Sequence, residues 1–254
     1  MIYIINKNSP QSIGKILEIF MKAMLLRVGI DKGCGGTLAP IFEDGTFEYI
    51  PIPEEDPEST ETRTYNNTFG RYGEIFGLYV PNKIKNEIMH FDPEFDTFTY
   101  GDSTSKRKFL LKLKKNDLLV FYAGLTPYEN DKCPDGLYII GYFTVKAIVD
   151  FNDLSDEETQ KYSEKFSNNA HIKRKMDQKD LIIVSGDESH SKLLRTPILI
   201  SEPKLNIAGR LYHAVSREME EKLAIKGSIQ RSIPPRIIEN PENIENLKKM
   251  LHII

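Results

Sequence analysis

Two long apolar runs constrain the fold of this chain more than any other feature of its sequence. The runs Leu118 to Ala123 and Leu137 to Val149 are rich in β-branched and aromatic residues and carry almost no charge. Near-continuous apolar runs are typical of strands buried on both faces of a sheet. The segment between them, residues 124–136, is irregular and too short for a crossover helix, so we expect an antiparallel pair. The chain is therefore predicted to fold around a sheet centred on this pair.

Length and composition indicate one globular domain. The 254 residues suffice for a full core, and 40% hydrophobic and 28% charged residues are typical proportions. No run approaches ~18 apolar residues, so no membrane span is expected. A net charge of -3 gives no overall nucleic-acid signal, so any polyanion contact needs a local basic surface. We expect residues 1–20 to be an N-terminal extension without a secretory pattern, and residues 21–254 to be a single domain.

Only two cysteines occur in the chain, Cys34 and Cys133. A domain of this size needs no disulfide, so we expect two free thiols in a cytoplasmic protein. Two cysteines also cannot form a Cys-rich zinc site by themselves.

Local signals predict the other elements. Ser155 followed three residues later by Glu158 forms a capping box, which predicts a helix over residues 154–166. Asp44-Gly45 between two runs of aromatic and β-branched residues predicts a hairpin. The remaining expected elements are helices at 105–113 (capped by Asp102 or Ser103), 189–194, 217–225 and from 243, and strands at 25–30, 181–184 and 198–201. This mixture predicts an α+β domain on a mixed, largely antiparallel sheet with flanking helices, either open or closed into a PUA-like barrel.

The first expected strand ends in a glycine-rich loop, Asp31-Lys32-Gly33-Cys34-Gly35-Gly36. Glycines let backbone N–H groups converge on an anion, and Lys32 adds a positive charge. The loop lacks the spacing and the Lys-Ser/Thr pair of a P-loop. A strand, an Asp-x-Gly loop and a hairpin are similar to the first phosphate loop of actin-like phosphotransferases, but no second Asp-Gly loop is found. A tight turn and a reactive Cys34 thiol are the other interpretations.

Polar residues concentrate in two further segments. Residues 90–102 carry His90 and four carboxylates, Asp92, Glu94, Asp96 and Asp102. They could bind a divalent cation or act as acid and base, although their spacing matches no metal loop and acidic surface segments are common. Residues 168–175 include His171 and Arg174 and, with Lys192, Arg195, Arg231 and Arg236, could form the local basic surface. Tyr100, Tyr122 and Tyr128 could stack on a base. A solvated charged face is the alternative.

Several of these blocks, taken in order, resemble a known family. LLRVGIDKGCGGTLAPIFEDGTFEYIPIPE, FDPEFDTFTYGD, DLLVFYAGL with GLYIIGYFTV, and NNAHIKR resemble the nucleotide modification associated domain type 3. The resemblance implies an α+β domain of archaea, bacteria and phages, linked to the synthesis or handling of modified bases in DNA. The family's polar motif positions would fall on Asp31, Asp44, Asp92, Tyr100, Asp102, His171 and Arg174. The pair DLLVFYAG and GLYIIGYFTV is also similar to the core hairpin of PUA-like and EVE-type barrels, which bind modified bases in an aromatic pocket.

The residues and the resemblance together predict a protein that binds a nucleotide, or a base in nucleic acid, DNA rather than RNA. As an enzyme, it would use four catalytic residues: Asp31, Asp92, Asp102 and His171. The nucleotide-binding residues would be Lys32, Gly33, Gly35, Gly36, Tyr100, Tyr122, Arg174 and Lys192. As a non-catalytic reader, it would instead need an aromatic cage. An enzyme should gather its acids and His171 around one site, whereas a reader should scatter them. No metal, cofactor or oligomeric state is specified by the sequence.

Overall fold

The computed structural model describes residues 21–174 and 180–253. The expected extension, residues 1–20, and Lys175 of the basic segment lie outside the described residues. No helix in the described residues combines the length and the apolar character that crossing a bilayer requires.

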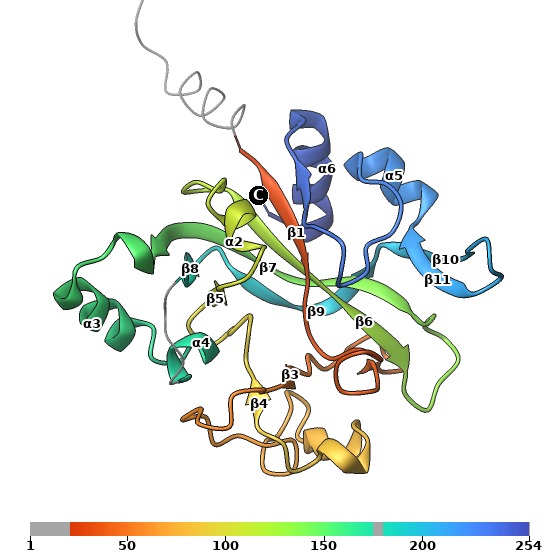
Figure 1. Ribbon diagram of the computed structural model, residues 1–254. Coiled ribbons are helices and arrows are strands. Elements are labelled where there is room, and N and C mark those ends of the chain that lie inside the picture. Colours follow the sequence, from red (N-terminus) through yellow and green to blue (C-terminus); the bar gives the residue numbers. More distant parts are fainter. Residues whose placement is uncertain (1–20, 175–179, 254) are drawn as a thin grey trace, which may run out of the picture.

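The two apolar runs form the central strands of the sheet, β6 (Leu118–Pro127) and β7 (Gly136–Asp150). They pair antiparallel, with Leu118 opposite Thr144 and Leu125 opposite Gly136, which confirms the prediction. The first strand, β1 (Ala23–Arg27), is buried throughout and runs parallel to β6. Figure 1 shows β1 and β6 crossing the middle of the molecule. Burial on both faces explains why these strands contain so few polar side chains.

The sheet is mixed and largely antiparallel, as predicted. Its strand order is β12 (Arg236–Ile238), β1, β6, β7, β8 (Ile182–Gly186) and β5 (Thr99–Asp102). Two more strands join it: β2 (Ala39–Ile41) lies parallel to β6, and β9 (Lys192–Leu199) lies antiparallel to β7. β12 and β5 end the strand path of the described residues without pairing with each other, so no barrel closes and that alternative was wrong.

Smaller elements surround the sheet (Figure 1). β3 (Ile52–Pro53) pairs with β4 (Met89–His90) below it, and β10 (Ser201–Leu205) forms a hairpin with β11 (Leu211–Val215) at the right. The α-helices are α2 (Arg107–Leu110), α3 (Asp156–Lys165), α4 (Ala170–Lys173), α5 (Arg217–Leu223) and α6 (Pro241–Leu251). Single 3-10 turns cover η1 (Phe76–Leu78), η2 (Asn82–Ile84) and η3 (Phe151–Asp153). The fold is therefore α+β, with α3 and α4 on one side of the sheet and α5 and α6 on the other.

The local predictions had mixed outcomes. The Ser155–Glu158 capping box is present at the start of α3. The Asp-Gly turn is also present, because Phe42 N–H donates to the Thr46 carbonyl and Phe47 bridges to Ile41. The helix expected at 189–194 was wrong: a turn at 187–190 leads directly into β9, whose hydrogen bonds to β7 outweigh local propensity. Helix α2 is shorter than expected, and no side chain caps it; Asp102 instead accepts the Thr104 N–H.

An aromatic cluster fixes the acidic segment onto the sheet. The Phe95 ring packs edge-to-face against Phe121, Phe143 and Tyr49, with centroids 5.8, 5.4 and 5.5 Å away. Gly141 makes room for this ring, because a Cβ there would lie 2.8 Å from Phe95 Cε1. Burying an aromatic side chain contributes about 2–3 kcal/mol. Phe95 therefore holds residues 90–98, and the polar groups among them, against the core.

Candidate functional site

Three side chains from distant parts of the chain meet beside β5. They are His90 at the end of β4, Asp92 two residues later, and His171 in α4. One potential ligand atom from each lies within 4.8 Å of the other two. His171 Nε2 lies 3.6 Å from Asp92 Oδ2, and the two imidazole rings stand edge-to-face with centroids 4.8 Å apart. We call this group the histidine–aspartate centre.

His90 is oriented by a buried carboxylate. Pairing of β3 with β4 sets Ile52 opposite His90, which brings Glu54 beside the ring. Glu54 Oε2 lies 2.7 Å from His90 Nδ1, and Glu54 Oε1 accepts a hydrogen bond from Arg174 Nε at 2.8 Å. Burial raises the pKa of Glu54, but the bonds to His90 and Arg174 outweigh burial and hold the pKa well below its usual value. Burial lowers the pKa of His90, which favours the neutral imidazole.

Asn169 connects the other two members. Its side chain caps α4 by accepting the His171 N–H at 3.0 Å, and its amide group lies 3.4 Å from Asp92 Oδ1. Asp92 Oδ1 also accepts the Gly101 N–H at 2.8 Å, so Oδ2 is left facing His171. Gly101 is required here, because a Cβ would lie 2.6 Å from His171 Cδ2. Asp92 and His171 are therefore placed by one shared set of contacts.

This arrangement has the donors of a divalent transition-metal site. Two imidazoles and one carboxylate suit zinc or iron. Tetrahedral ligands about 2.1 Å from a metal lie roughly 3.4 Å apart, close to the observed 3.6 Å between His171 and Asp92. Because Glu54 occupies Nδ1 of His90, Nε2 is the nitrogen left to bind. A histidine ligand whose other nitrogen contacts a carboxylate is the usual pattern around such metals.

The predicted catalytic residue Asp102 lies next to this centre. It follows Gly101 on β5, accepts the Thr104 N–H at 2.7 Å, and lies 3.5 Å from the Tyr100 hydroxyl. Burial, and then the negative charges of Asp102 and Asp92, raise the pKa of Tyr100 well above its usual value. Tyr100 is therefore a neutral phenol that contacts Asp102 and lies within electrostatic reach of Asp92.

Asp31, the fourth predicted catalytic residue, lies in a different group. Its Oδ2 accepts a hydrogen bond from Arg231 Nε at 2.7 Å, and its Oδ1 accepts the N–H groups of Gly33 and Cys34. No hydrogen bond or ion pair within residues 21–174 and 180–253 joins it to the histidine–aspartate centre. The charges of Asp92 and Arg231 nevertheless both influence the pKa of the buried Tyr49, which burial raises well above its usual value. Tyr49 Oη is buried without a hydrogen-bond partner.

The glycine-rich loop is closed on itself. Gly33 and Cys34 donate their N–H groups to Asp31, and Gly36 N–H donates to the Asp31 carbonyl. Gly35 has φ +101°, and a Cβ there would lie 2.4 Å from Ile30, so it serves the turn. Lys32 is exposed. Burial raises the pKa of Cys34, which favours the thiol over the reactive thiolate.

The other predicted nucleotide-binding residues do not gather at one site. Tyr100 and Tyr122 are buried, and Tyr122 donates its hydroxyl to the Ile229 carbonyl. Arg174 contacts Glu54, while Lys192 is exposed on β9, where it pairs with Tyr142. Neither tyrosine offers an open ring face for a base.

A half-exposed aromatic group is the nearest approach to a cage. Phe42, Tyr79 and Tyr128 pack edge-to-face, with centroids 5.0–6.0 Å apart. Sandwiching a base needs two parallel faces about 7 Å apart, a geometry that edge-to-face packing does not provide. These rings therefore pack against each other instead of framing a slot.

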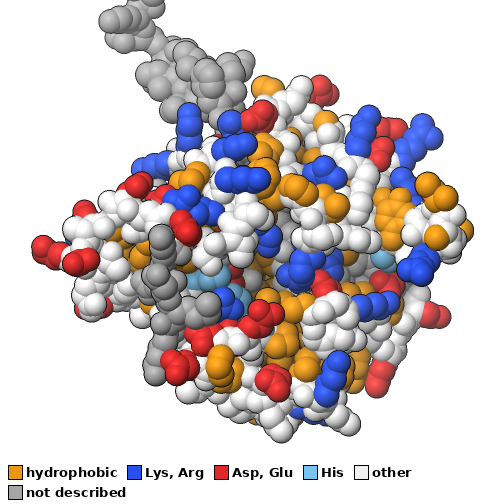
Figure 2. All heavy atoms as spheres, viewed as in Figure 1, with side chains coloured by type: hydrophobic (Ala, Val, Ile, Leu, Met, Phe, Trp, Pro, Cys, Tyr) orange, Lys and Arg blue, Asp and Glu red, His pale blue; other side chains and the backbone are white. Residues whose placement is uncertain are grey.

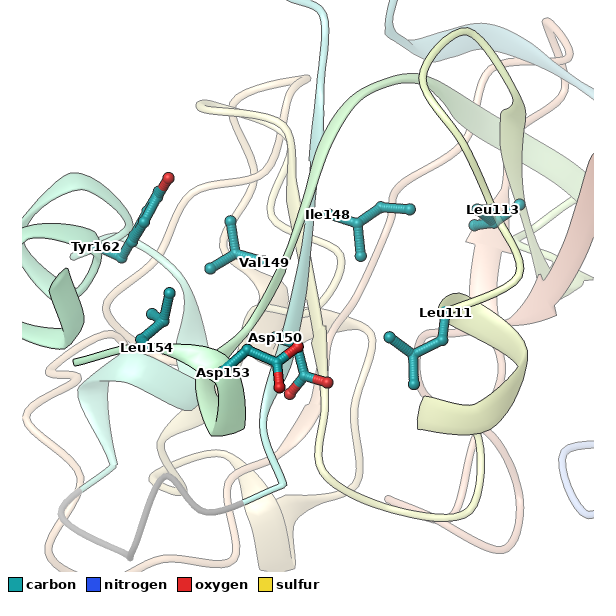
Figure 3. Close-up of a pocket in the computed structure, with 8 residues that line it drawn as sticks. All are labelled: Leu111, Leu113, Ile148, Val149, Asp150, Asp153, Leu154 and Tyr162. Atoms are coloured by element: carbon teal, nitrogen blue, oxygen red, sulfur yellow. The ribbon is translucent and has the colours of Figure 1, made fainter.

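A cavity of about 400 Å³ opens elsewhere, between α2 and α3 (Figure 3). Its lining is mixed, with Leu111, Ile148 and Leu154 around Asp150 and Asp153. Asp150 is paired with Arg107. None of the predicted site residues lines this cavity.

Sequence reasoning missed several residues that shape these groups. Glu54 begins a polar, acidic stretch that carries no motif, and only β3–β4 pairing reveals its role. Asn169 was included only as part of a basic segment. Arg27 did carry a signal: an arginine inside the apolar run Leu25 to Ile30 must be buried with its strand.

Comparison with known proteins places this geometry in a family. The profile of nucleotide modification associated domain 3 matches residues 22–232. The chain belongs to this family. The match contains the histidine–aspartate centre, Asp31 and Arg231, and ends before β12 and α6. No curated protein and no solved structure shows significant similarity to the chain. Family membership supports a role associated with nucleotide modification.

Proposed function

We propose that this protein is an enzyme that modifies a nucleotide or a nucleobase, and that the histidine–aspartate centre is its metal-binding active site. The observation that carries the proposal is the convergence of His90, Asp92 and His171 within 4.8 Å. The family context supplies the nucleotide part of the proposal.

The surroundings of the histidine–aspartate centre support a catalytic role over a purely structural one. Glu54 bonds to the His90 ring and is 1% exposed at its side chain, and Asn169 caps the helical turn that carries His171 by accepting its backbone N–H. Burying a carboxylate costs several kcal/mol unless it is well paired. A fold that maintains a buried Glu–His pair next to an Asp–His pair holds four titratable groups in fixed positions, as catalysis requires.

Each residue has a defined role in the proposal. His90, Asp92 and His171 would bind the metal, and Glu54 would hold His90 in the tautomer that presents Nε2. A bound metal of this class supplies a nucleophilic hydroxide near neutral pH, or polarises a carbonyl or phosphoryl oxygen. Asp102 and the neutral Tyr100 phenol would exchange protons or hydrogen bonds with the substrate beside it.

Metal analysis is the first test. The full chain, purified without chelators, should contain close to one equivalent of zinc, iron or manganese by mass spectrometry. His171→Ala should lose this metal, and the exposed His190→Ala should keep it, since His190 contacts only Asp187 on the surface. A wild-type protein that binds none of these metals in titration would contradict the proposal.

Turnover is the second test. We would incubate the metal-loaded protein with a panel of free and DNA-embedded nucleotides, modified and unmodified, with and without chelator. Any turnover should disappear in Asp92→Asn and in the presence of the chelator. Turnover that survives both changes would remove the histidine–aspartate centre from the chemistry.

The non-catalytic reader is the alternative function. It would require binding of a modified base without turnover, through an aromatic cage. Binding that is unchanged in His171→Ala but lost in Tyr128→Ala would favour the reader.

A further inference from the structure

Arg27 is a buried cation without an anion bonded to it. It ends β1 and is 8% exposed. Within the described residues its guanidinium makes no hydrogen bond or ion pair, and its Nε is buried without any partner. An unpaired buried charge is costly, and arginine has five N–H donors to satisfy. An anion that accepted hydrogen bonds from this guanidinium would offset that cost.

Two further arginines lie beside the β1 segment: the charge of Arg231 acts on Arg27, and Arg236 of β12 pairs with Leu25 of β1. Arg231 donates to Asp31 and to the carbonyl of Gly29, two residues after β1. Arg236 donates to the Ser228 carbonyl and, like Arg27, keeps a buried Nε without a partner. The charges of all three arginines act on the buried Tyr122 hydroxyl, which donates to the carbonyl of Ile229, the neighbour of Ser228.

Positive charge exceeds negative charge in this group. Asp31 is the one carboxylate that forms an ion pair with any of the three arginines in the described part of the chain, and it is bonded to Arg231. Burial, and then the charge of Arg231, lower the pKa of Arg27 to about 10. Three cations against one anion leave an excess of two positive charges in a half-buried position.

The geometry therefore points to an anion-binding site formed by Arg27, Arg231 and Arg236, and we propose that it takes the terminal phosphate of a nucleotide. Guanidiniums bind phosphate oxygens bidentately, and several donors around one buried point suit a group with three free oxygens. The depth of Arg27 favours a terminal phosphate over a diester within a polynucleotide, since a terminal group can enter end-on.

The location agrees with this role. The charges of Arg231 and Asp92 both influence the buried Tyr49 hydroxyl, so the arginine group and the histidine–aspartate centre both lie within electrostatic reach of this side chain. Figure 2 shows this face hollowed across its middle, with Lys and Arg side chains inside the hollow and His side chains nearby. A nucleotide held by its phosphate at the arginines could extend its sugar and base toward the centre. The assignment as a substrate site rests on the proposed function; the anion site itself does not.

The test uses the full chain in chelator, so that no metal contributes to phosphate binding. Calorimetric titration with inorganic pyrophosphate and with a deoxynucleoside monophosphate should show saturable binding to the wild type. Arg27→Met, which keeps the length of the stem, should weaken both at least about tenfold. Arg217→Met removes an arginine with an 88% exposed side chain and should change neither. An oligodeoxynucleotide without terminal phosphates should bind wild type and Arg27→Met equally.

The melting temperature of Arg27→Met distinguishes a ligand-binding role of Arg27 from a structural one. Removing an unpaired buried cation should leave the melting temperature of the free protein unchanged or higher. Equal pyrophosphate affinity in wild type and Arg27→Met, or no binding by the wild type at millimolar concentrations, would overturn the proposal. Loss of oligonucleotide binding alone in Arg27→Met would also overturn it, in favour of a diester site. Metal binding, measured in both wild type and Arg27→Met, tests the proposed function independently of the anion site.

Discussion

The histidine–aspartate centre and the arginine group differ in how completely their charges are satisfied. In the centre, the Glu54 carboxylate has four hydrogen-bonded partners, the ring of His90, the guanidinium of Arg174 and two backbone N–H groups, and Asp92 has three polar neighbours. In the arginine group, Arg27 and Arg236 each keep a buried nitrogen without a partner. A network whose polar groups are all hydrogen-bonded fixes the geometry of its side chains, whereas buried polar groups without partners can be satisfied by a bound ligand. This difference agrees with the two proposals, a preorganised metal centre and a separate anion site whose donors a ligand would satisfy.

The largest effect on metal affinity should come from a substitution in the histidine–aspartate centre. Asp92→Asn removes the only carboxylate among the three proposed ligands, and we expect metal affinity to fall about 100-fold or more, since loss of an orienting partner alone costs about 10- to 100-fold. Metal titration followed by calorimetry measures this. Pyrophosphate affinity should stay constant in the same variant; a parallel loss would mean that the two groups form one site.

Glu54→Gln should have the next largest effect. It keeps the shape of the side chain but removes the charge shared by His90 and Arg174. We expect metal affinity to fall about 10-fold, and stability to fall by about 2–3 kcal/mol because Arg174 loses its partner. Chemical denaturation and metal titration give the two values. Unchanged metal affinity would show that the tautomer of His90 does not matter.

Gly101→Ala tests the fit of His171 by sterics alone. The new Cβ would lie 2.6 Å from His171 Cδ2, so the ring must move. We expect a several-fold loss of metal affinity and about 1–3 kcal/mol of lost stability from overpacking. Gly33→Ala, where a Cβ meets its nearest atom at 3.4 Å, is the matched control. Equal metal affinity in both variants would mean that His171 is not constrained by β5.

The smallest expected effect is a loss of stability on substitution of Glu61, which bonds to Lys173 of α4. Glu61 accepts hydrogen bonds from Arg63 and Lys173; burial raises its pKa, but these bonds outweigh burial and lower it to about 2. A lowered carboxyl pKa contributes stability above the unfolded value near 4.5, and that contribution is lost as pH falls toward 2. After allowance for solvent screening, Glu61→Gln should cost about 1–2 kcal/mol at pH 7 and less near pH 3. An equal cost at both pH values would contradict this account.

The sequence predicted the centre of the fold better than its edges. The runs of β6 and β7 are so apolar that only a buried antiparallel pair fits them, and the capping box of α3 is a local signal. The first part of strand β9 was missed because residues 189–194 look helical in isolation, whereas its last two residues fall in the strand expected at 198–201; only pairing with β7 decides the outcome. Barrel closure depends on which strands meet at the edges, which no local pattern encodes.

The candidate site shows the same limit. His171, Asp92 and Asp102 were predicted from residue type and resemblance, and the structure brings Asp92 and His171 together. Their roles stay predictions until tested. Glu54 and Asn169 could not be found, because their contacts join residues 36 and 77 positions apart in the chain. Asp31 looked catalytic because its loop is glycine-rich, but its acceptor atoms are occupied by its own loop and by Arg231.

The bond between Asp31 and Arg231 spans 200 positions of the chain. The histidine–aspartate centre uses residues between 54 and 174, so its pieces leave the ribosome well before Arg231 does. A phosphate bound by Arg27 and Arg231 would act as a non-covalent clasp between the first strand and the C-terminal segment. Such a ligand stabilises the folded chain in proportion to the logarithm of its concentration. The cellular nucleotide concentration would then set the stability of the contact between β1 and the C-terminal segment.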